Sequence, residues 1–203
     1  MKPVAFVDRA ERALVLRALR PQDAPALFVL NQALIWDGEG MVLIPEEAHS
    51  PEELARRIAE VHRHGGLFLG AFEDEELVGS LDLARIPRSM LRHNASLGMG
   101  IHPDYQGVGL GRRLLTLALA WAQEQGISRV ELFVRSDNLR AQQLYVSLGF
   151  VPIHLRKAFV RLPDGSMLDD LYMEWLDPDL EQLVELEEEA DLELEEEDEA
   201  WGI

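Results

Sequence analysis

The sequence predicts a mixed α/β domain, and three observations lead to that fold class. First, strand-like and helix-like patterns follow in the order β-α-α-β-β-β-α-β-α-β-β, which is not a regularly alternating βαβ array. Second, 203 residues with 47% hydrophobic side chains are enough to bury one sizeable core. Third, the composition changes at one boundary, near Pro178. We therefore expect one domain over residues 1–177 and a separate C-terminal tail over 178–203.

The first part of the chain is predicted to form a strand and two helices. Residues 13–19 are a strand-like apolar run, and apolar positions recur at helical spacing within 20–34. A loop is expected over 36–49. The helix at 50–64 has the clearest start, because Ser50 can cap it, a proline follows at the first helical position and a glutamate completes a capping box.

Three strands are expected in the middle of the chain. Residues 66–72 and 76–84 flank the four-acid turn "EDEE", which is typical of a β-hairpin. The third strand, 95–101, contains Gly98 and Gly100. Glycine inside a strand often marks a bulge or a close approach of a ligand to the backbone, and we expect one of these here.

Two more helices and three more strands complete the predicted domain. The helix at 110–121 follows a glycine-rich turn, and 128–134 alternates as a strand. A short helix within 137–150 ends at a glycine that suits a C-terminal cap. The strands 153–162 and 167–176 are joined by the turn "PDGS".

Charge is concentrated at the C-terminus. The formal net charge is −18, but thirteen acids and no Lys or Arg lie within 178–203, which leaves −5 for the rest. A segment of this composition repels itself and is expected to be disordered. Neither part carries the basic stripe that nucleic-acid binding requires, so no nucleic-acid partner is expected.

Composition also limits the chemistry and the location. The absence of cysteine excludes disulfides, thiolate metal sites and a cysteine nucleophile, and no metal site is expected. Charged residues between Asp8 and Arg12 interrupt the apolar core that a signal peptide needs. The most apolar stretch, 114–122, is too short to span a bilayer. We expect a cytoplasmic protein with no membrane partner.

The glycine turn in "HPDYQGVGLGRRLL", residues 102–115, is typical of a phosphate-binding turn that opens a helix. A nucleoside-triphosphate loop is excluded because Arg112 and Arg113 stand where Lys and Ser or Thr are needed. A dinucleotide fingerprint fits poorly, because its third small position falls on Arg112 or Leu114. What remains is Gln106-x-x-Gly-x-Gly between a strand and a helix.

This motif resembles the acyl-CoA signature [RQ]-x-x-G-x-[GA] of the GNAT superfamily of N-acyltransferases. The strand "ASLGMGI" is similar to the family's splayed, bulged strand, and "LRALRPQDAPAL" is similar to its first strand and helix. Downstream, Asn138, Tyr145 and the "LGF" at 148–150 match family positions. The resemblance covers roughly residues 13–176. It implies a GNAT fold, in which helices flank a splayed, mostly antiparallel sheet.

The resemblance also implies a reaction and its residues. An amine attacks the acyl-CoA thioester directly in a ternary complex, so acetyl-CoA is the expected donor and a small-molecule or peptide amine the expected acceptor. Tyr145 is implied as the general acid, and backbone N–H groups on the bulged strand as the oxyanion hole. The implied acyl-CoA residues are Met99, Gly100, Ile101, Gln106, Gly107, Val108, Gly109, Leu110, Gly111, Arg112 and Asn138.

Several assignments stay open at this stage. The general base is not assigned. Ser96 stands about where many relatives have a glutamate that deprotonates the amine, and His102 or a solvent relay are the alternatives. Asn138 is alternatively a plain helix cap, and Tyr145 a plain core tyrosine. Competing functions are a non-catalytic acyl-CoA-binding module and an interaction protein that works through its acidic tail. The oligomeric state is also open, with a homodimer as one alternative. By family precedent the acceptor groove would include Asn31, Trp36, Arg92 and His93, with Arg88 beside them.

Overall fold

A computed structural model describes residues 1–38 and 42–180. Its eight strands form one sheet in the order β1-β2-β3-β4-β5-β6-β8-β7. All neighbouring pairs are antiparallel except β5 and β6, which are parallel. The strands are β1 (Val4–Val7), β2 (Ala13–Ala18), β3 (Leu67–Glu73), β4 (Glu76–Arg85), β5 (Asn94–Ile101), β6 (Arg129–Arg135), β7 (Val151–Arg161) and β8 (Met167–Leu176).

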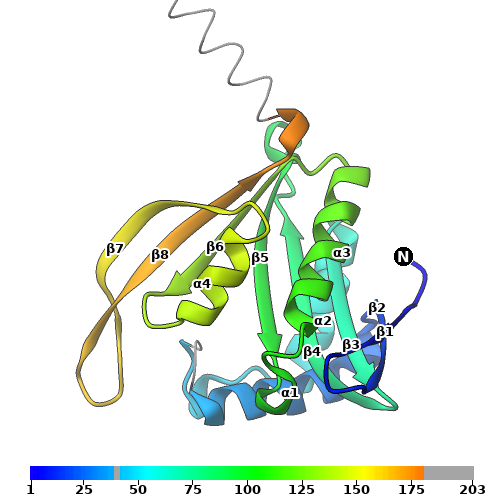
Figure 1. Ribbon diagram of the computed structural model, residues 1–203, viewed down its shortest axis with the longest axis horizontal. Helices are drawn as coiled ribbons and strands as arrows, with labels where there is room; N and C mark the ends of the chain where they lie inside the picture. The colour runs from blue at the N-terminus through cyan, green and yellow to red at the C-terminus, as the bar shows by residue number, and fades with distance from the viewer. Residues whose placement is uncertain (39–41, 181–203) are drawn as a thin grey trace, which may run out of the picture.

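Helices cover both faces of the sheet (Figure 1). On one face, α3 packs on β3 to β5 in a core that also takes in residues of α4; on the other, α1 and α2 pack on β3 and β4 in a second core. The helices are α1 (Ala24–Asp37), α2 (Pro51–Arg63), α3 (Leu110–Glu124) and α4 (Leu139–Val146). Short 3-10 turns include Pro103–Tyr105, directly after β5.

The predicted capping box at the start of α2 is confirmed. The Ser50 hydroxyl accepts a hydrogen bond from the Glu53 backbone N–H at 3.3 Å, and the Glu53 carboxylate accepts one from the Ser50 N–H at 2.8 Å. Leu54, Ile58 and Val61 then form the buried stripe of the helix. Local sequence alone therefore sets where this helix begins and which side it buries.

The sheet is splayed between its two parallel strands. The pairing of β5 with β6 runs from Asn94↔Arg129 to Ser96↔Glu131 and then ends. Beyond that point β5 pairs only with β4, and β6 only with β8. Figure 1 shows the two strands diverging, with α4 in front of β6. The second half of β5 therefore borders an opening in the sheet.

Two features differ from the sequence-based expectation, and a third lies mostly outside the described residues. The strand β1 was not expected and adds an edge to the sheet beside β2. Helix α1 reaches Asp37, inside the segment predicted as a loop, and Pro45–Glu47 forms a 3-10 turn there. The acidic tail begins within the described residues but lies outside them from residue 181 on, so the predicted disorder stays a prediction.

Candidate active site

The glycine turn between β5 and α3 leaves a row of backbone donors unused. Gly107 and Gly109 have φ angles of +74° and +95°, which L side chains rarely adopt. Among the described residues, no partner accepts a hydrogen bond from the N–H groups of Gly107, Val108 or Gly109. Helix α3 follows directly, and the N–H groups of its first three residues, Leu110 to Arg112, have no intrahelical acceptor. The turn is thus a concave set of donors suited to an anion.

Gln106 holds the turn in place. Its side-chain amide donates to the Ile101 carbonyl at 3.1 Å, and its side-chain oxygen accepts from Arg140 on α4. On the first turn of α3, Arg112 donates to the Ser147 hydroxyl at 2.7 Å. The Nε of Arg113 is buried without a hydrogen-bond partner. Cationic side chains therefore lie close to the glycine turn, although the domain as a whole is acidic.

The glycines of β5 face α1 and α2 and make room for side chains there. A Cβ at Gly100 would lie 2.4 Å from Cδ1 of Leu34, and one at Gly98 would lie 2.8 Å from Oδ1 of Asp82. The register between β4 and β5 is continuous from Gly79↔Ile101 to Arg85↔Ala95, so the expected bulge is not present in this described pairing. Separation from β6, rather than a bulge, is what opens the backbone beside Met99 and Ile101.

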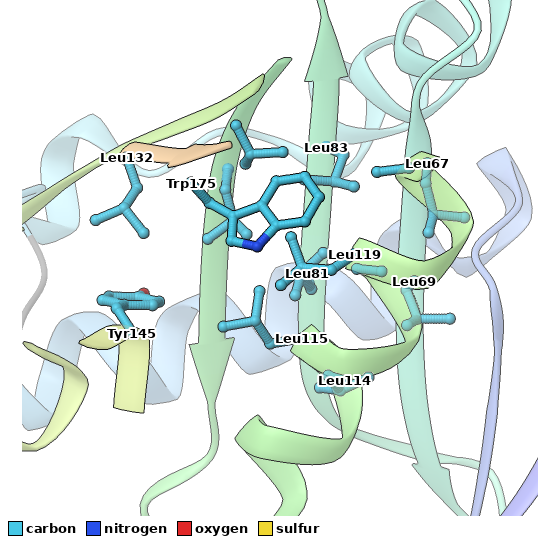
Figure 2. Close-up of a cluster of buried hydrophobic side chains, with 14 of the residues drawn as sticks. Leu67, Leu69, Leu81, Leu83, Leu114, Leu115, Leu119, Leu132, Tyr145 and Trp175 are labelled. Carbon is cyan, nitrogen blue, oxygen red and sulfur yellow. The ribbon is translucent and has the colours of Figure 1, made fainter. Parts of the chain in front are cut away.

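Tyr145 lies on α4 and is 6% exposed, in the core shared with α3. Its ring centroid is 5.6 Å from that of Phe150, and Figure 2 shows it on the side of the cluster that includes Leu132. Burial raises the pKa of Tyr145 to about 12, so the phenol is protonated at neutral pH. No hydrogen bond joins its hydroxyl to another described residue. The O–H group is therefore available as a donor.

Asn138 caps α4. Its side-chain oxygen accepts a hydrogen bond from the Ala141 backbone N–H at 3.1 Å. This is the alternative that the sequence left open for Asn138, and it occupies the oxygen. The amide NH₂ group has no partner among the described residues, so it can still donate. Asn138 thus fixes where α4 starts, and so where Tyr145 stands.

The structure separates the predicted acceptor residues into two groups. Asn31 and Trp36 lie on α1 on either side of Leu34, which contacts Gly100, and Trp36 is 78% exposed. Arg92 and His93 are exposed just before β5 begins, at the far end of that strand from Ile101. A strand of eight residues spans about 25 Å. Arg92 and His93, with Arg88 before them, are therefore not brought together with the glycine turn.

Sequence reasoning did not identify Asp82 as a site residue. Asp82 is buried in β4 beside Gly98, and its carboxylate accepts a hydrogen bond from Arg57 of α2 at 2.8 Å. Burial raises the pKa of Asp82, and the Arg57 guanidinium partly offsets this. The available signal was an acid inside the otherwise apolar strand "LVGSLDLA". A charge buried in that position needs a partner or a function.

A second polar cluster lies on the same face of the sheet, across the opening. Glu131 is paired in register with exposed Ser96, and the Tyr172 hydroxyl donates to the Glu131 carboxylate at 3.0 Å. Arg129 pairs with Glu174 and also donates to the Tyr172 hydroxyl at 2.9 Å. Burial and the hydrogen bonds to the two glutamates raise the pKa of Tyr172. The carboxylates of Asp82 and Glu131 thus lie on either side of Gly98 and Gly100 of β5.

The described helices include none that is both long enough and apolar enough to cross a bilayer. Over the same described residues, no group of three or more His, Asp or Glu side chains is placed to hold a metal ion.

Comparison with known proteins decides the family. The profile of the acetyltransferase (GNAT) family matches residues 33–150, which is more than half of the chain. The chain belongs to the GNAT acetyltransferase family. The match includes the glycine turn and Tyr145, so the motif that the sequence pointed to and the opening beside it lie inside the matched region.

Named relatives support this assignment, and a solved structure shows the same fold. N-alpha-acetyltransferase RimI of Mycobacterium tuberculosis is 34% identical over 124 residues, 61% of this chain and 75% of its own length. Mycothiol acetyltransferase of Sanguibacter keddieii is 32% identical over 155 residues, 74% of this chain and 48% of its own length. YncA of Salmonella typhimurium, described as an acetyltransferase and solved with acetyl-CoA, superposes with a TM-score of 0.72 at 19% identity, over 80% of this chain and 93% of that one. This chain thus spans about half of the mycothiol enzyme.

Proposed function

We propose that this chain transfers an acetyl group from acetyl-CoA to a primary amine by direct attack in a ternary complex. The observation that carries the proposal is the splay of β5 from β6 directly before a glycine turn with unused N–H groups. The opening and the donor row lie at the same end of β5, so one extended molecule can occupy both. The absence of cysteine agrees with direct attack, since no acyl-cysteine intermediate can form.

The residues present fit the phosphate part of CoA. Backbone N–H groups from Gly107 to Arg112 would contact the pyrophosphate, and a Cβ at Gly107 would have no atom within 4 Å, so this side of the turn is open. Gln106 would keep the turn in shape. The donor, when bound, supplies the acetyl group and a thiolate leaving group. The backbone N–H groups of Met99 and Ile101, on the side of β5 that faces the opening, would then donate to the thioester oxygen, whereas that of Gly100 points toward β4.

Tyr145 would act on the leaving sulphur. A free thiol has a pKa near 8.5, about 3.5 units below that of Tyr145, so full proton transfer would be uphill by about 5 kcal/mol if the thiol kept that value. A hydrogen bond from the Tyr145 O–H to the developing thiolate has no such cost. We therefore assign Tyr145 as the donor that stabilises the thiolate, with proton delivery completed as the site opens to solvent.

The acceptor would enter from the face that carries α1 and α2. Asp82 stands on one side of the β5 glycines and Glu131 on the other, so the face favours a cationic or polar amine. The relatives named above act as an N-alpha-acetyltransferase and a mycothiol acetyltransferase, and both names fit an amine acceptor. A protein N-terminus and a small amine are thus the two acceptor types to compare.

A non-catalytic acyl-CoA-binding module is the second candidate. The observation that favours it is exposed Ser96 at the position where many relatives place a glutamate. The two candidates share CoA binding and differ in turnover. An interaction protein that works through its acidic tail would require neither.

Binding and turnover are tested in sequence. Acetyl-CoA at a hundred times its Kd should stabilise the chain by about 2.7 kcal/mol, seen as a rise in Tm. Absence of any rise at millimolar acetyl-CoA would contradict the assignment of the glycine turn. Thiol release from acetyl-CoA with a panel of amines then separates an enzyme from a module. A chain truncated after residue 177 that keeps both properties would limit the tail to solubility or partner binding.

A further inference from the structure

The turn between β1 and β2, residues 8–12, is a rigid unit. The buried carboxylate of Asp8 accepts hydrogen bonds from the backbone N–H groups of Ala10 and Arg12 at 2.8 and 3.0 Å, and from Nε of Arg12 at 2.8 Å. Burial alone raises the pKa of Asp8, but the hydrogen bonds from Arg12 and Ala10 outweigh it and hold the pKa below its usual value. Asp8 is therefore ionised near neutral pH and keeps the turn closed.

This turn is fastened to the segment that leads into α3. The backbone N–H of Arg9 donates to the Val108 carbonyl at 3.0 Å, inside the glycine turn itself. The Arg12 guanidinium donates to the Asp104 carbonyl at 3.1 Å and stacks 3.8 Å above the ring centroid of Tyr105. Three contacts thus fix the position of residues 8–12 relative to the glycine turn. Because β1 was not expected from sequence, this attachment was not expected either.

The fastening places the Arg9 side chain beside the donor row. A Cβ built on Gly109 would lie 3.7 Å from Nε and 4.0 Å from Cγ of Arg9. Arg9 is exposed, and no other described residue forms a hydrogen bond or ion pair with its side chain. A free guanidinium next to unused backbone N–H groups can bind the same phosphate, since it adds charge-assisted hydrogen bonds to those of the backbone.

The neighbouring arginines are differently engaged. Arg112 donates to Ser147 and Arg140 to Gln106, so each has a protein partner, and the Nε of Arg113 is buried. Arg9 is therefore the exposed cation at the turn whose guanidinium has no protein partner among the described residues. Arg9 is also far from the glycine turn in sequence, and its backbone is held beside the turn by the hydrogen bond to Val108.

We propose that Arg9, carried by the β1–β2 turn, is a phosphate-binding residue of the acyl-CoA site. The inference rests on the proposed function, because it takes CoA as the ligand of the glycine turn. The residue binds a CoA phosphate and takes no part in the chemistry of acetyl transfer. The β1–β2 hairpin, which the contacts of Arg9 and Arg12 fasten to residues 104–108, thereby becomes part of the cofactor site.

The test is calorimetric binding of CoA to the full chain and to Arg9→Ala, Arg9→Lys and Arg63→Ala. Arg63 is the matched control, since it is an exposed arginine near the C-terminus of α2, with no side-chain partner among the described residues. Arg9→Ala should weaken CoA binding about tenfold, Arg9→Lys less, and Arg63→Ala by less than twofold. Raising the salt concentration should reduce the difference between the native chain and Arg9→Ala.

Two further probes identify which phosphate Arg9 binds. If it is the 3′-phosphate, the effect of Arg9→Ala should disappear with 3′-dephospho-CoA; if it is the pyrophosphate, the effect should persist there and disappear with pantetheine. Binding of CoA to Arg9→Ala within twofold of the native chain would overturn the inference. Failure of the native chain to bind CoA at all would instead overturn the proposed function, so the two failures are distinguishable. Circular dichroism and Tm of each variant show whether folding is retained.

Discussion

Removal of Arg57 tests the charge that the structure buries on the face of the sheet covered by α1 and α2. Arg57 of α2 is the partner of Asp82, whose side chain is only 12% exposed while that of Arg57 is 50% exposed. Arg57→Gln leaves Asp82 buried without its cation. The matched control is Arg56→Gln, the adjacent exposed arginine of the same helix, which has no side-chain hydrogen bond in the described structure.

The expected size follows from the exposure of the pair. Breaking a fully buried pair costs 3–5 kcal/mol, and an exposed pair contributes 0.2–1 kcal/mol. This half-exposed pair lies between the two, so Arg57→Gln should lose about 1–2 kcal/mol of unfolding free energy at pH 7. For a chain of this size that is a fall in Tm of about 2–8 °C. In a double-mutant cycle, Arg57→Gln and Asp82→Asn should be non-additive by about the same free energy.

The pH dependence has a definite sign. The pKa of Asp82 is raised in the folded state, so the native chain holds a proton more tightly than the unfolded chain does, and stability is lost as pH rises through the folded pKa. Without Arg57 that pKa rises further. The deficit of Arg57→Gln should therefore be largest at neutral pH and shrink as the pH falls toward 4 and the Asp82 carboxylate of the folded chain takes up a proton. Urea unfolding across this range measures it. A deficit equal to that of Arg56→Gln, or one that does not change with pH, would refute the reasoning.

Three further predictions concern the site itself. Tyr145→Phe should lower kcat at least tenfold and leave the Kd for acetyl-CoA unchanged, measured by thiol release and calorimetry; an unchanged kcat would remove Tyr145 from the mechanism. Gly109→Ala and Gly126→Ala both place an L side chain at positive φ, +95° and +68°, so each should lose about 1–2 kcal/mol in urea unfolding, whereas only Gly109→Ala should weaken CoA binding. Gly100→Ala should cost about 1–3 kcal/mol by overlap with Leu34, and Leu34→Ala in the same chain should recover part of it; additive losses would argue against the overlap.

Local sequence predicted the features that depend on local chemistry. The capping box at Ser50 and the glycine turn at 107–111 need only a few neighbouring residues, and both lie where the sequence placed them. The strand β1 was missed because four residues with alternating burial give little signal before the charged turn that begins at Asp8. Its place in the sheet is decided by pairing with β2, not by its own composition.

The features that could not be predicted depend on contacts between distant segments. The family resemblance implied a splayed sheet, but "ASLGMGI" alone does not show that β5 loses its β6 partner after Ser96, because that point follows from how β6 and β8 pair. The sequence indicated a bulge or a ligand close to the backbone at Gly98, whereas the structure places the Asp82 carboxylate where a Cβ at Gly98 would be. The attachment of Arg9 to Val108 spans 99 positions in the chain. Arg92 and His93 were placed by precedent, and the direction of β5 puts them at its far end.

The central claim is that acetyl-CoA bound at the glycine turn acetylates an amine that enters beside the β5 glycines. Its most direct measurement is mass spectrometry of amines incubated with acetyl-CoA and the chain, using peptides with a free N-terminus, the same peptides with a blocked N-terminus, and small primary amines. The proposal predicts acetylated product from at least one free amine, none from blocked peptides, and a large loss with Tyr145→Phe. Tight acetyl-CoA binding with no acetylated product from any amine would contradict it and favour the non-catalytic module.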